Sequence, residues 1–199
     1  MFYNFARWVF GVVIRLLFKV EAEGFEKIPS SGALVVCANH ISWWDPCLVA
    51  YLVPRPVHFM AKKELFQNRF LAFLFGKLYA FPVNREKPDI GAVKQGLSVL
   101  KNGHALGVFP EGTRQKTPNQ LGQGHAGAAL LAMKTEAPLV PIAIRGTYGF
   151  RKTIRVACGE PFRVVPSGGR LSDDLKEGSE KVMLAIKELW DDLTPEEVA

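Results

Sequence analysis

The sequence predicts an α/β domain with a single mixed β-sheet flanked by helices. Short apolar runs of strand length alternate with stretches of helical periodicity, and this alternation is typical of layered α/β folds. The 199 residues match the usual size of one domain. The composition is 48% hydrophobic and 22% charged, which supplies enough apolar material for a core and excludes a disordered chain. We therefore expect one folded unit, residues 21–199, behind an N-terminal helix over residues 1–20.

The first twenty residues predict an amphipathic helix at a membrane surface. At about 100° per residue, the polar and small residues fall on one stripe: these are Asn4, Arg7, Gly11, Arg15 and Lys19. Large apolar residues fill the rest of the helical wheel, as in helices that lie in a membrane interface. The longest uncharged stretch, Trp8–Ile14, is seven residues, whereas a spanning helix needs about 20. A helix packed on its own domain or on a partner would show a similar pattern.

The first elements of the domain follow a short linker, Glu21–Gly32, that is rich in Gly, Ser and Pro. Ala33–Ala38 is a fully apolar run and predicts a buried strand. Asp45 and Pro46 predict the start of a helix that continues to about Tyr51, with Asp45 as the N-cap and Pro46 at the first helical position. Val57–Ala61 predicts a second strand.

The later elements continue the same alternation. Leu65–Leu78 predicts an aromatic helical stretch and Tyr79–Val83 a short strand. Asp89 predicts the cap of a helix that ends at about Leu100 and is closed by Asn102-Gly103. The remaining predicted elements are a strand over 105–109, a helix over 124–135, a strand over 139–145, an antiparallel pair of strands over 153–158 and 162–165, and a helix over 172–193.

The charge balance favours an anionic partner. Lys and Arg number 25 and Asp and Glu 19, a formal net charge of +6, which suits nucleic acid, an anionic membrane surface or a phosphorylated substrate. The mean hydropathy of +0.08 is high for so basic a chain, and no aromatic-flanked basic cluster predicts RNA binding. We therefore expect no nucleic-acid partner. The three cysteines form no CxxC pair and are typical of core residues in a reducing compartment: Cys37, Cys47 and Cys158.

Several common chemistries find no support in the sequence. A GxSxG elbow for a serine hydrolase is absent, as are the glycine-rich phosphate loops of nucleotide-binding proteins. The histidines show no metal-ligand spacing, so we expect no zinc: they are His40, His58, His104 and His125.

One candidate catalytic pair lies just after the first buried strand, in the segment Asn39–Asp45. His40 leaves the strand and Asp45 begins the next helix, so the loop between them can fold back until the carboxylate accepts the imidazole N–H. The other ring nitrogen would then be free as a general base. In the alternative interpretation Asp45 is only an N-cap and His40 is a surface residue.

Two further strand ends carry groups that suit an anion. Phe109–Arg114 runs from a strand into a Pro-Glu-Gly turn and offers backbone N–H groups, a hydroxyl and a guanidinium, which fit an oxyanion or a phosphate. Phe81–Arg85 delivers another arginine. An ordinary turn with a solvated arginine would give the same pattern.

These blocks and Val140-Pro141-Ile142 occur in the order and spacing of the four motif blocks of the glycerolipid acyltransferase superfamily. Over about residues 20–165 the chain resembles bacterial 1-acylglycerol-3-phosphate (lysophosphatidate) acyltransferases. The resemblance implies an O-acyltransferase that moves an acyl group from a thioester to the sn-2 hydroxyl of lysophosphatidic acid and makes phosphatidic acid for phospholipid synthesis. The sequence departs from the family pattern at Asn84, Gln115 and His125.

The resemblance also implies a role for each block. His40 would deprotonate the attacking hydroxyl and Asp45 would orient the imidazole. Val140 and Pro141 would lie by the acyl chain or shape its pocket. The acceptor's phosphate and glycerol would be held by Arg85, Glu111, Gly112, Thr113 and Arg114.

The resemblance implies the expected co-substrate, and the N-terminal helix with the positive net charge indicates the expected location. We expect no cofactor, with acyl-CoA or acyl-carrier protein as co-substrate. We also expect a peripheral or monotopic protein bound to an anionic membrane surface, the cytoplasmic face of the cell membrane. Two alternatives remain: an acyltransferase for another lysolipid or hydroxylated lipid, and a non-enzymatic membrane-binding protein that keeps the fold.

Overall fold

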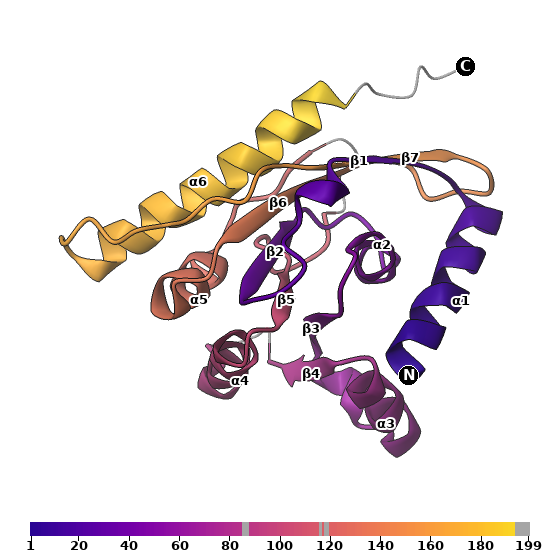
Figure 1. Ribbon diagram of the computed structural model, residues 1–199, viewed down its shortest axis with the longest axis horizontal. Helices are drawn as coiled ribbons and strands as arrows, with labels where there is room; N and C mark the ends of the chain where they lie inside the picture. The colour runs from indigo at the N-terminus through magenta and orange to yellow at the C-terminus, as the bar shows by residue number, and fades with distance from the viewer. Residues whose placement is uncertain (85–87, 116, 118–119, 194–199) are drawn as a thin grey trace.

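The computed structural model describes residues 1–84, 88–115, 117 and 120–193 and contains one mixed seven-stranded sheet with helices on both faces (Figure 1). The strands lie in the order β1-β7-β6-β2-β5-β3-β4. They are β1 (Lys19–Glu23), β2 (Leu34–Ala38), β3 (Val57–Lys62), β4 (Ala80–Val83), β5 (Ala105–Val108), β6 (Leu139–Gly146) and β7 (Thr153–Cys158). The helices are α1 (Phe2–Leu17), α2 (Asp45–Leu52), α3 (Arg69–Lys77), α4 (Ile90–Lys101), α5 (Gly127–Thr135) and α6 (Leu171–Asp192), with short 3₁₀ turns η1 (Phe25–Lys27) and η2 (Lys63–Phe66). The predicted fold class is confirmed.

Strand direction determines where a ligand site can form. β6 and β7 pair antiparallel, while β2 pairs parallel with both β5 and β6, and β3 joins β5 and β4 in the same sense. The carboxyl ends of β2, β5 and β6 therefore meet at one edge of the sheet. In open α/β sheets this is the edge at which ligands bind.

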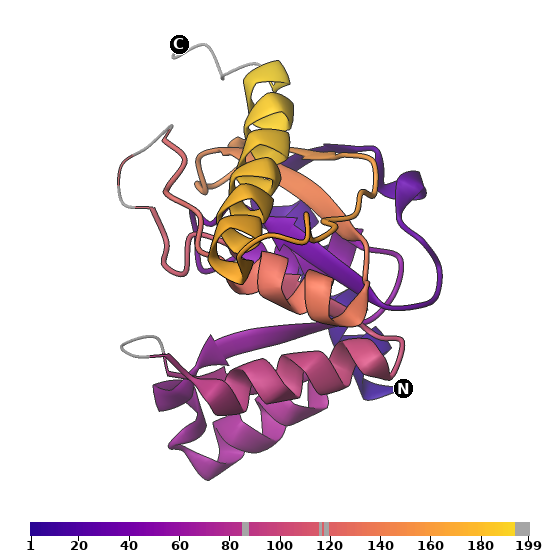
Figure 2. The ribbon, with the colours of Figure 1, turned by 90° about the vertical axis from the view of Figure 1, so that its left-hand side faces the viewer.

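The central strand β2 is buried on both faces and divides the core in two. Leu34 and Val36 pack into a cluster with residues of α1 and α2, whereas Val35 and Cys37 pack into a second cluster with α4, α5 and α6. Figure 2 shows α4, α5 and α6 across the face opposite to α1 and α2. An apolar residue at every position of the strand follows from this two-sided burial.

The predicted linker over 21–32 is wrong in its first part. Residues 19–23 form edge strand β1, which pairs parallel with β7 in the register Lys19↔Thr153 to Glu23↔Ala157. Most side chains of β1 are exposed, so the strand is held by backbone hydrogen bonds and carries no apolar pattern. The 3₁₀ turn η1 follows it.

Two other predicted elements differ in the structure. Residues 162–165 form no strand with β7; Phe162 makes a single antiparallel bridge with Leu139 of β6. The predicted helical stretch over 65–78 is split into η2 and α3, because the Asn68 side chain accepts from the N–H groups of Phe70 and Leu71 and starts a new helix there. The Asp89 cap of α4 is confirmed, with its carboxylate 3.0 Å from the N–H of Ala92.

Helix α1 ends at Leu17, three residues before the predicted end. It packs on the domain with part of the predicted polar stripe and with the apolar residue Ile14. Gly11 is buried against the Tyr51 ring, and the Arg7 guanidinium donates to the Tyr51 carbonyl at 3.0 and 3.2 Å. The opposite stripe is open: the exposed fraction of Trp8 is 65%, and Phe5 and Leu16 are exposed with it. Within the described chain, no helix combines the length and apolarity needed to cross a bilayer.

We expect Gly11→Leu to lower the free energy of unfolding by about 1–3 kcal/mol, the usual cost of overpacking. A Cβ at position 11 would lie 2.4 Å from a ring carbon of Tyr51, so α1 must move away from α2. Gly76→Ala in α3 is the matched control, because a Cβ there meets nothing within 4 Å. Urea unfolding of both variants tests this, and equal stabilities would show that α1 is not packed through Gly11.

Candidate active site

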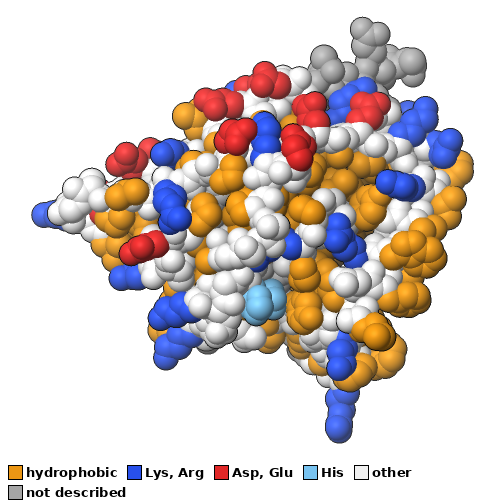
Figure 3. Space-filling model, in the orientation of Figure 1, with side chains coloured by type: hydrophobic (Ala, Val, Ile, Leu, Met, Phe, Trp, Pro, Cys, Tyr) orange, Lys and Arg blue, Asp and Glu red, His pale blue; other side chains and the backbone are white. Residues whose placement is uncertain are grey.

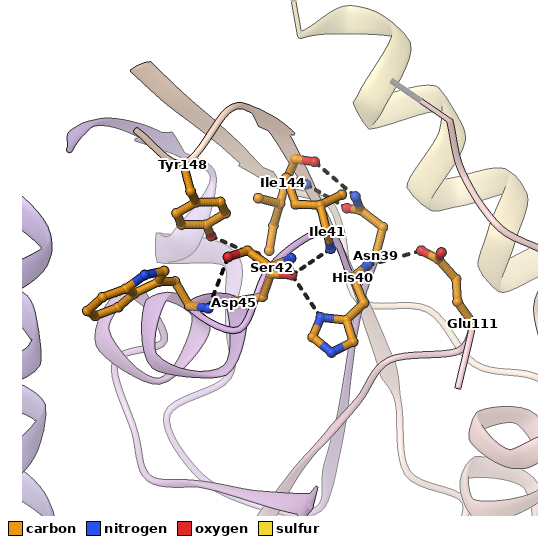
Figure 4. A network of polar contacts seen from close by, with 9 residues as sticks. Asn39, His40, Ile41, Ser42, Asp45, Glu111, Ile144 and Tyr148 are labelled. Atoms are coloured by element: carbon orange, nitrogen blue, oxygen red, sulfur yellow. Dashed lines mark hydrogen bonds and ion pairs between the residues drawn. The ribbon is translucent and has the colours of Figure 1, made fainter. Parts of the chain in front are cut away.

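His40 and Asp45 form a buried pair at the carboxyl end of β2. The His40 Nδ1 atom lies 2.8 Å from the Asp45 Oδ2 atom (Figure 4). The same oxygen accepts the backbone N–H groups of Ile41 at 2.6 Å and Ser42 at 2.7 Å. Asp45 is 0% exposed. The short loop therefore folds around the carboxylate, as the spacing of the two residues predicts.

Asp45 is not the N-cap of α2, contrary to the sequence prediction. Trp44 occupies the N-cap position without a side-chain cap, and Asp45 is the first residue of the helix. Its carboxylate turns back to the N–H groups of Ile41 and Ser42 and to the imidazole, and does not cap the first turn of the helix.

The pairing of Nδ1 with Asp45 sets the chemistry of the ring. A carboxylate is an acceptor only, so it keeps the imidazole hydrogen on Nδ1 and leaves Nε2 with a free electron pair. The Phe109 ring stacks on the imidazole with centroids 4.1 Å apart and planes 19° apart, which fixes the plane of the ring. The arrangement can remove a proton from a hydroxyl placed at Nε2.

Glu111 connects the second block to the first. It is 3% exposed, and its two oxygens accept the N–H groups of His40 at 3.0 Å and Gly122 at 3.1 Å. Burial raises the pKa of Glu111, while these donors and the Gln115 side chain oppose that shift. The Gln115 N–H also donates to the His40 carbonyl at 2.8 Å. The peptide groups on both sides of His40 are thus held by one turn.

The rest of this turn lies beside the histidine loop. Gly112 has a φ of +69°, a left-handed conformation that favours glycine, and a Cβ there would lie 3.2 Å from the His125 ring. Thr113 is exposed. The Arg114 guanidinium stacks over the Trp43 ring at 3.8 Å from its centroid, which holds the charge next to the loop that carries His40. Arg85 lies outside the described residues.

Val140 and Pro141 lie within the sheet, where they pair with Val36 and Cys37 of β2. Both are buried. They belong to β6, the strand that also contains Ile144 and that precedes the loop with Tyr148. The predicted contact with an acyl chain stays a prediction.

Two groups that hold the site were not predicted from the sequence. The Asn39 amide donates to the Ile144 carbonyl at 2.9 Å and accepts the Ile144 N–H at 2.7 Å, which fastens the end of β2 to β6. A polar residue directly after an all-apolar strand was the available signal. The Tyr148 hydroxyl donates to Asp45 Oδ1 at 2.7 Å; it lies 103 residues away in a loop without a motif, and no sequence signal indicated it.

Fold and geometry together define a class of protein: an α/β enzyme in which a carboxylate-oriented histidine can act as a general base on a hydroxyl. The acyltransferase family model matches residues 19–145, and the chain belongs to this family. The family expectation from the motif blocks is therefore confirmed.

Two bacterial relatives share the name 1-acyl-sn-glycerol-3-phosphate acyltransferase. The 1-acyl-sn-glycerol-3-phosphate acyltransferase of Bacillus subtilis is 34% identical over 181 residues, which is 85% of this chain and 89% of that protein. The protein of the same name from Pseudomonas aeruginosa is 29% identical over 89% of this chain and 71% of its own. A crystal structure of the 1-acyl-sn-glycerophosphate (LPA) acyltransferase from Thermotoga maritima superposes with a TM-score of 0.70 at 27% identity, covering 94% of this chain and 78% of that one.

Proposed function

We propose that this protein transfers an acyl group from a thioester, acyl-CoA or acyl-carrier protein, to the sn-2 hydroxyl of lysophosphatidic acid, giving phosphatidic acid. The observation that carries the proposal is the buried His40–Asp45 pair, with Nδ1 bonded to the carboxylate at 2.8 Å. The names of the relatives from Bacillus subtilis and Pseudomonas aeruginosa support the choice of acceptor.

In the proposed reaction His40 Nε2 accepts the proton of the acceptor hydroxyl as the oxygen attacks the thioester carbonyl. An alcohol is too weak an acid to ionise beforehand, so the proton must leave during the attack. Asp45 stabilises the imidazolium that forms. The C–O bond forms, the C–S bond breaks, and the departing thiolate takes the proton from the imidazolium. This general-base step contributes about 10²–10⁴ in rate.

The turn that follows β5 is the proposed site for the acceptor's phosphate. Arg114 supplies a positive charge beside His40, and its stacking on Trp43 limits the positions of the guanidinium. Gly112 and Thr113 add a backbone N–H and a hydroxyl that suit phosphate oxygens. By family resemblance Arg85 belongs to the same site. Glu111 holds this turn in place by accepting the N–H groups of His40 and Gly122.

The proposed location is the cytoplasmic face of the cell membrane. The open stripe of α1 and the neighbouring helix α3 both expose apolar side chains, and none of the nine residues of α3 is buried. Phe70 on α3 is 72% exposed. Figure 3 shows hydrophobic side chains gathered along the edge where Figure 1 places α1. Exposed cations flank these helices and suit anionic lipid headgroups: Arg15, Lys62, Lys63, Arg69 and Lys77.

His40→Ala and Asp45→Asn test the proposed reaction. Purified protein with vesicle-borne lysophosphatidic acid and either donor should yield phosphatidic acid, measured by mass spectrometry. We expect His40→Ala to lower kcat about 10²–10⁴-fold, and Asp45→Asn to lower it strongly, because an amide cannot accept from all the donors around it. If product formed only from another lysolipid, that lipid and not lysophosphatidic acid would be the acceptor. No transfer to any acceptor would favour a membrane-binding protein without catalysis.

Arg114→Ala should weaken the use of lysophosphatidic acid about ten- to a hundred-fold, the value of a charge-assisted hydrogen bond. The KM for the acyl donor should change much less. Arg114→Lys should restore activity only in part, since an ammonium lacks the planar fork of the guanidinium. Steady-state kinetics with the phosphate acceptor and with a phosphate-free monoacylglycerol checks this, and equal losses for both would contradict the assignment.

The double variant Phe5→Glu with Trp8→Glu should release the protein from anionic vesicles, because both exposed side chains would have to bury a charge in the lipid. Leu184→Glu on α6, on the opposite face of the sheet, is the matched control and should bind as the wild type does. Co-sedimentation with phosphatidylglycerol vesicles measures the effect. Unchanged binding of the double variant would show that α1 does not contact lipid.

A further inference from the structure

Each oxygen of the Asp45 carboxylate accepts hydrogen bonds, and the donors to the two oxygens come from different parts of the chain. Oδ2 accepts from the His40 ring and from two N–H groups of its own loop, whereas Oδ1 accepts from the Tyr148 hydroxyl at 2.7 Å (Figure 4). Because Asp45 is completely buried, an Oδ1 atom without this donor would be an unsatisfied anionic oxygen, which is costly.

Tyr148 is held in place from two sides. Gly146, two residues earlier, has a φ of +130°, and a Cβ there would lie 2.4 Å from the Thr153 carbonyl oxygen, so the turn after β6 needs glycine to bring Tyr148 back over α2. The Phe18 ring meets the Tyr148 ring edge-on, with centroids 5.1 Å apart and planes at 90°. Phe18 also packs edge-on against Trp44, the residue before Asp45.

The electrostatic surroundings keep the hydroxyl protonated. Burial raises the pKa of Tyr148 well above its usual range, and the negative charge of Asp45 acts in the same direction. The phenol is therefore protonated near neutral pH and can donate a hydrogen bond. Cys47 lies two residues after Asp45 in α2; burial and then the charge of Asp45 raise the pKa of its thiol to about 11, so it stays neutral as well.

We propose that Tyr148 is a positioning residue for acyl transfer: its hydroxyl fixes Asp45 Oδ1, so that Oδ2 faces His40 Nδ1 with part of its negative charge drawn away. The inference rests on the proposed function of the His40–Asp45 pair. Rotation about the terminal bond of an aspartate has a broad, two-fold preference, and the three donors on Oδ2 all come from a single loop. Tyr148 ties the other oxygen to the loop that follows β6, a separate part of the chain.

The proposal predicts a change that simple loss of packing would not produce. Without the phenol, the full charge of Asp45 faces the imidazole and favours the imidazolium in the resting enzyme. The acidic limb of the kcat/KM profile should therefore move to higher pH. Among the described residues, Glu111, which bonds to the His40 peptide N–H, and Cys47 are further titratable groups near the pair, and the substitution leaves both in place.

The test is Tyr148→Phe, which removes one hydroxyl and keeps the ring against Phe18. Tyr51→Phe on α2 removes the same hydroxyl from a ring packed against Gly11 and serves as the matched control. We expect Tyr148→Phe to lower kcat about 10–100-fold, to leave both KM values within about twofold, and to move the acidic limb upward. Tyr51→Phe should do none of this. Wild-type kinetics for Tyr148→Phe, or an equal loss at every pH, would overturn the proposal.

A second variant keeps the test decisive if Tyr148→Phe folds poorly. Site-specific replacement of Tyr148 by 3,5-difluorotyrosine keeps the ring and strengthens the donor, so the acidic limb should move to lower pH, the opposite direction. A limb that does not move, or moves upward, would overturn the proposal.

A substrate-free measurement separates this inference from the proposed function. The low-field proton NMR signal of His40 Nδ1–H, identified by its loss in His40→Ala, should move further downfield in Tyr148→Phe as Asp45 becomes a stronger acceptor. An unmoved signal would contradict the role of Tyr148 even if acyl transfer is confirmed. Absence of transfer by the wild type would contradict the proposed function alone.

Discussion

The site depends on how the buried end of β2 satisfies its backbone. A strand that leaves the centre of a sheet carries N–H and C=O groups that no neighbouring strand can pair, and leaving them unpaired in the interior is costly. Here the N–H of His40 donates to Glu111, its carbonyl accepts from Gln115, and the Asn39 side chain bonds both groups of Ile144. These bonds satisfy the backbone at the end of β2, and they hold His40 in place as a consequence.

Glu111 illustrates the cost of this solution. A nearly buried carboxylate loses hydration, which is why burial raises its pKa, and it regains stability from the N–H groups that it accepts. An uncharged acceptor could serve one N–H group, but two oxygens of one carboxylate serve His40 and Gly122 together. The same residue thereby connects His40 with Gly122, which lies in the segment before α5.

The sequence predicted the interior of the fold well, because burial leaves a pattern. β2 is apolar at every position since helices cover both of its faces, and the Asp89 cap depends on local chemistry alone. β1 was missed because an exposed edge strand held by main-chain bonds needs no apolar residues. The segment at 162–165 has strand-like composition, but β7 already has β1 and β6 on its two sides.

The same contrast applies to the site. The His40–Asp45 pair was predictable because a loop of that length can close on itself, and only the supposed capping role of Asp45 was wrong. Tyr148 was not predictable, since its meeting with Asp45 depends on the alignment of β6 with β2 and on the turn at Gly146. The helical wheel of the first twenty residues could not show that Arg7 and Gly11 face α2, or that Ile14 is buried in the core.

The exposed strand β1 has a consequence for the solubility of the sheet. An open sheet has two edges, and each offers free backbone groups that could pair with another chain. At one edge β1 carries Lys19, Glu21 and Glu23, so an approaching strand would have to bury charges. At the other edge β4 is four residues long and contains Pro82, which has no N–H to offer. Both borders of the sheet therefore resist aggregation, one by charge and one by a missing donor.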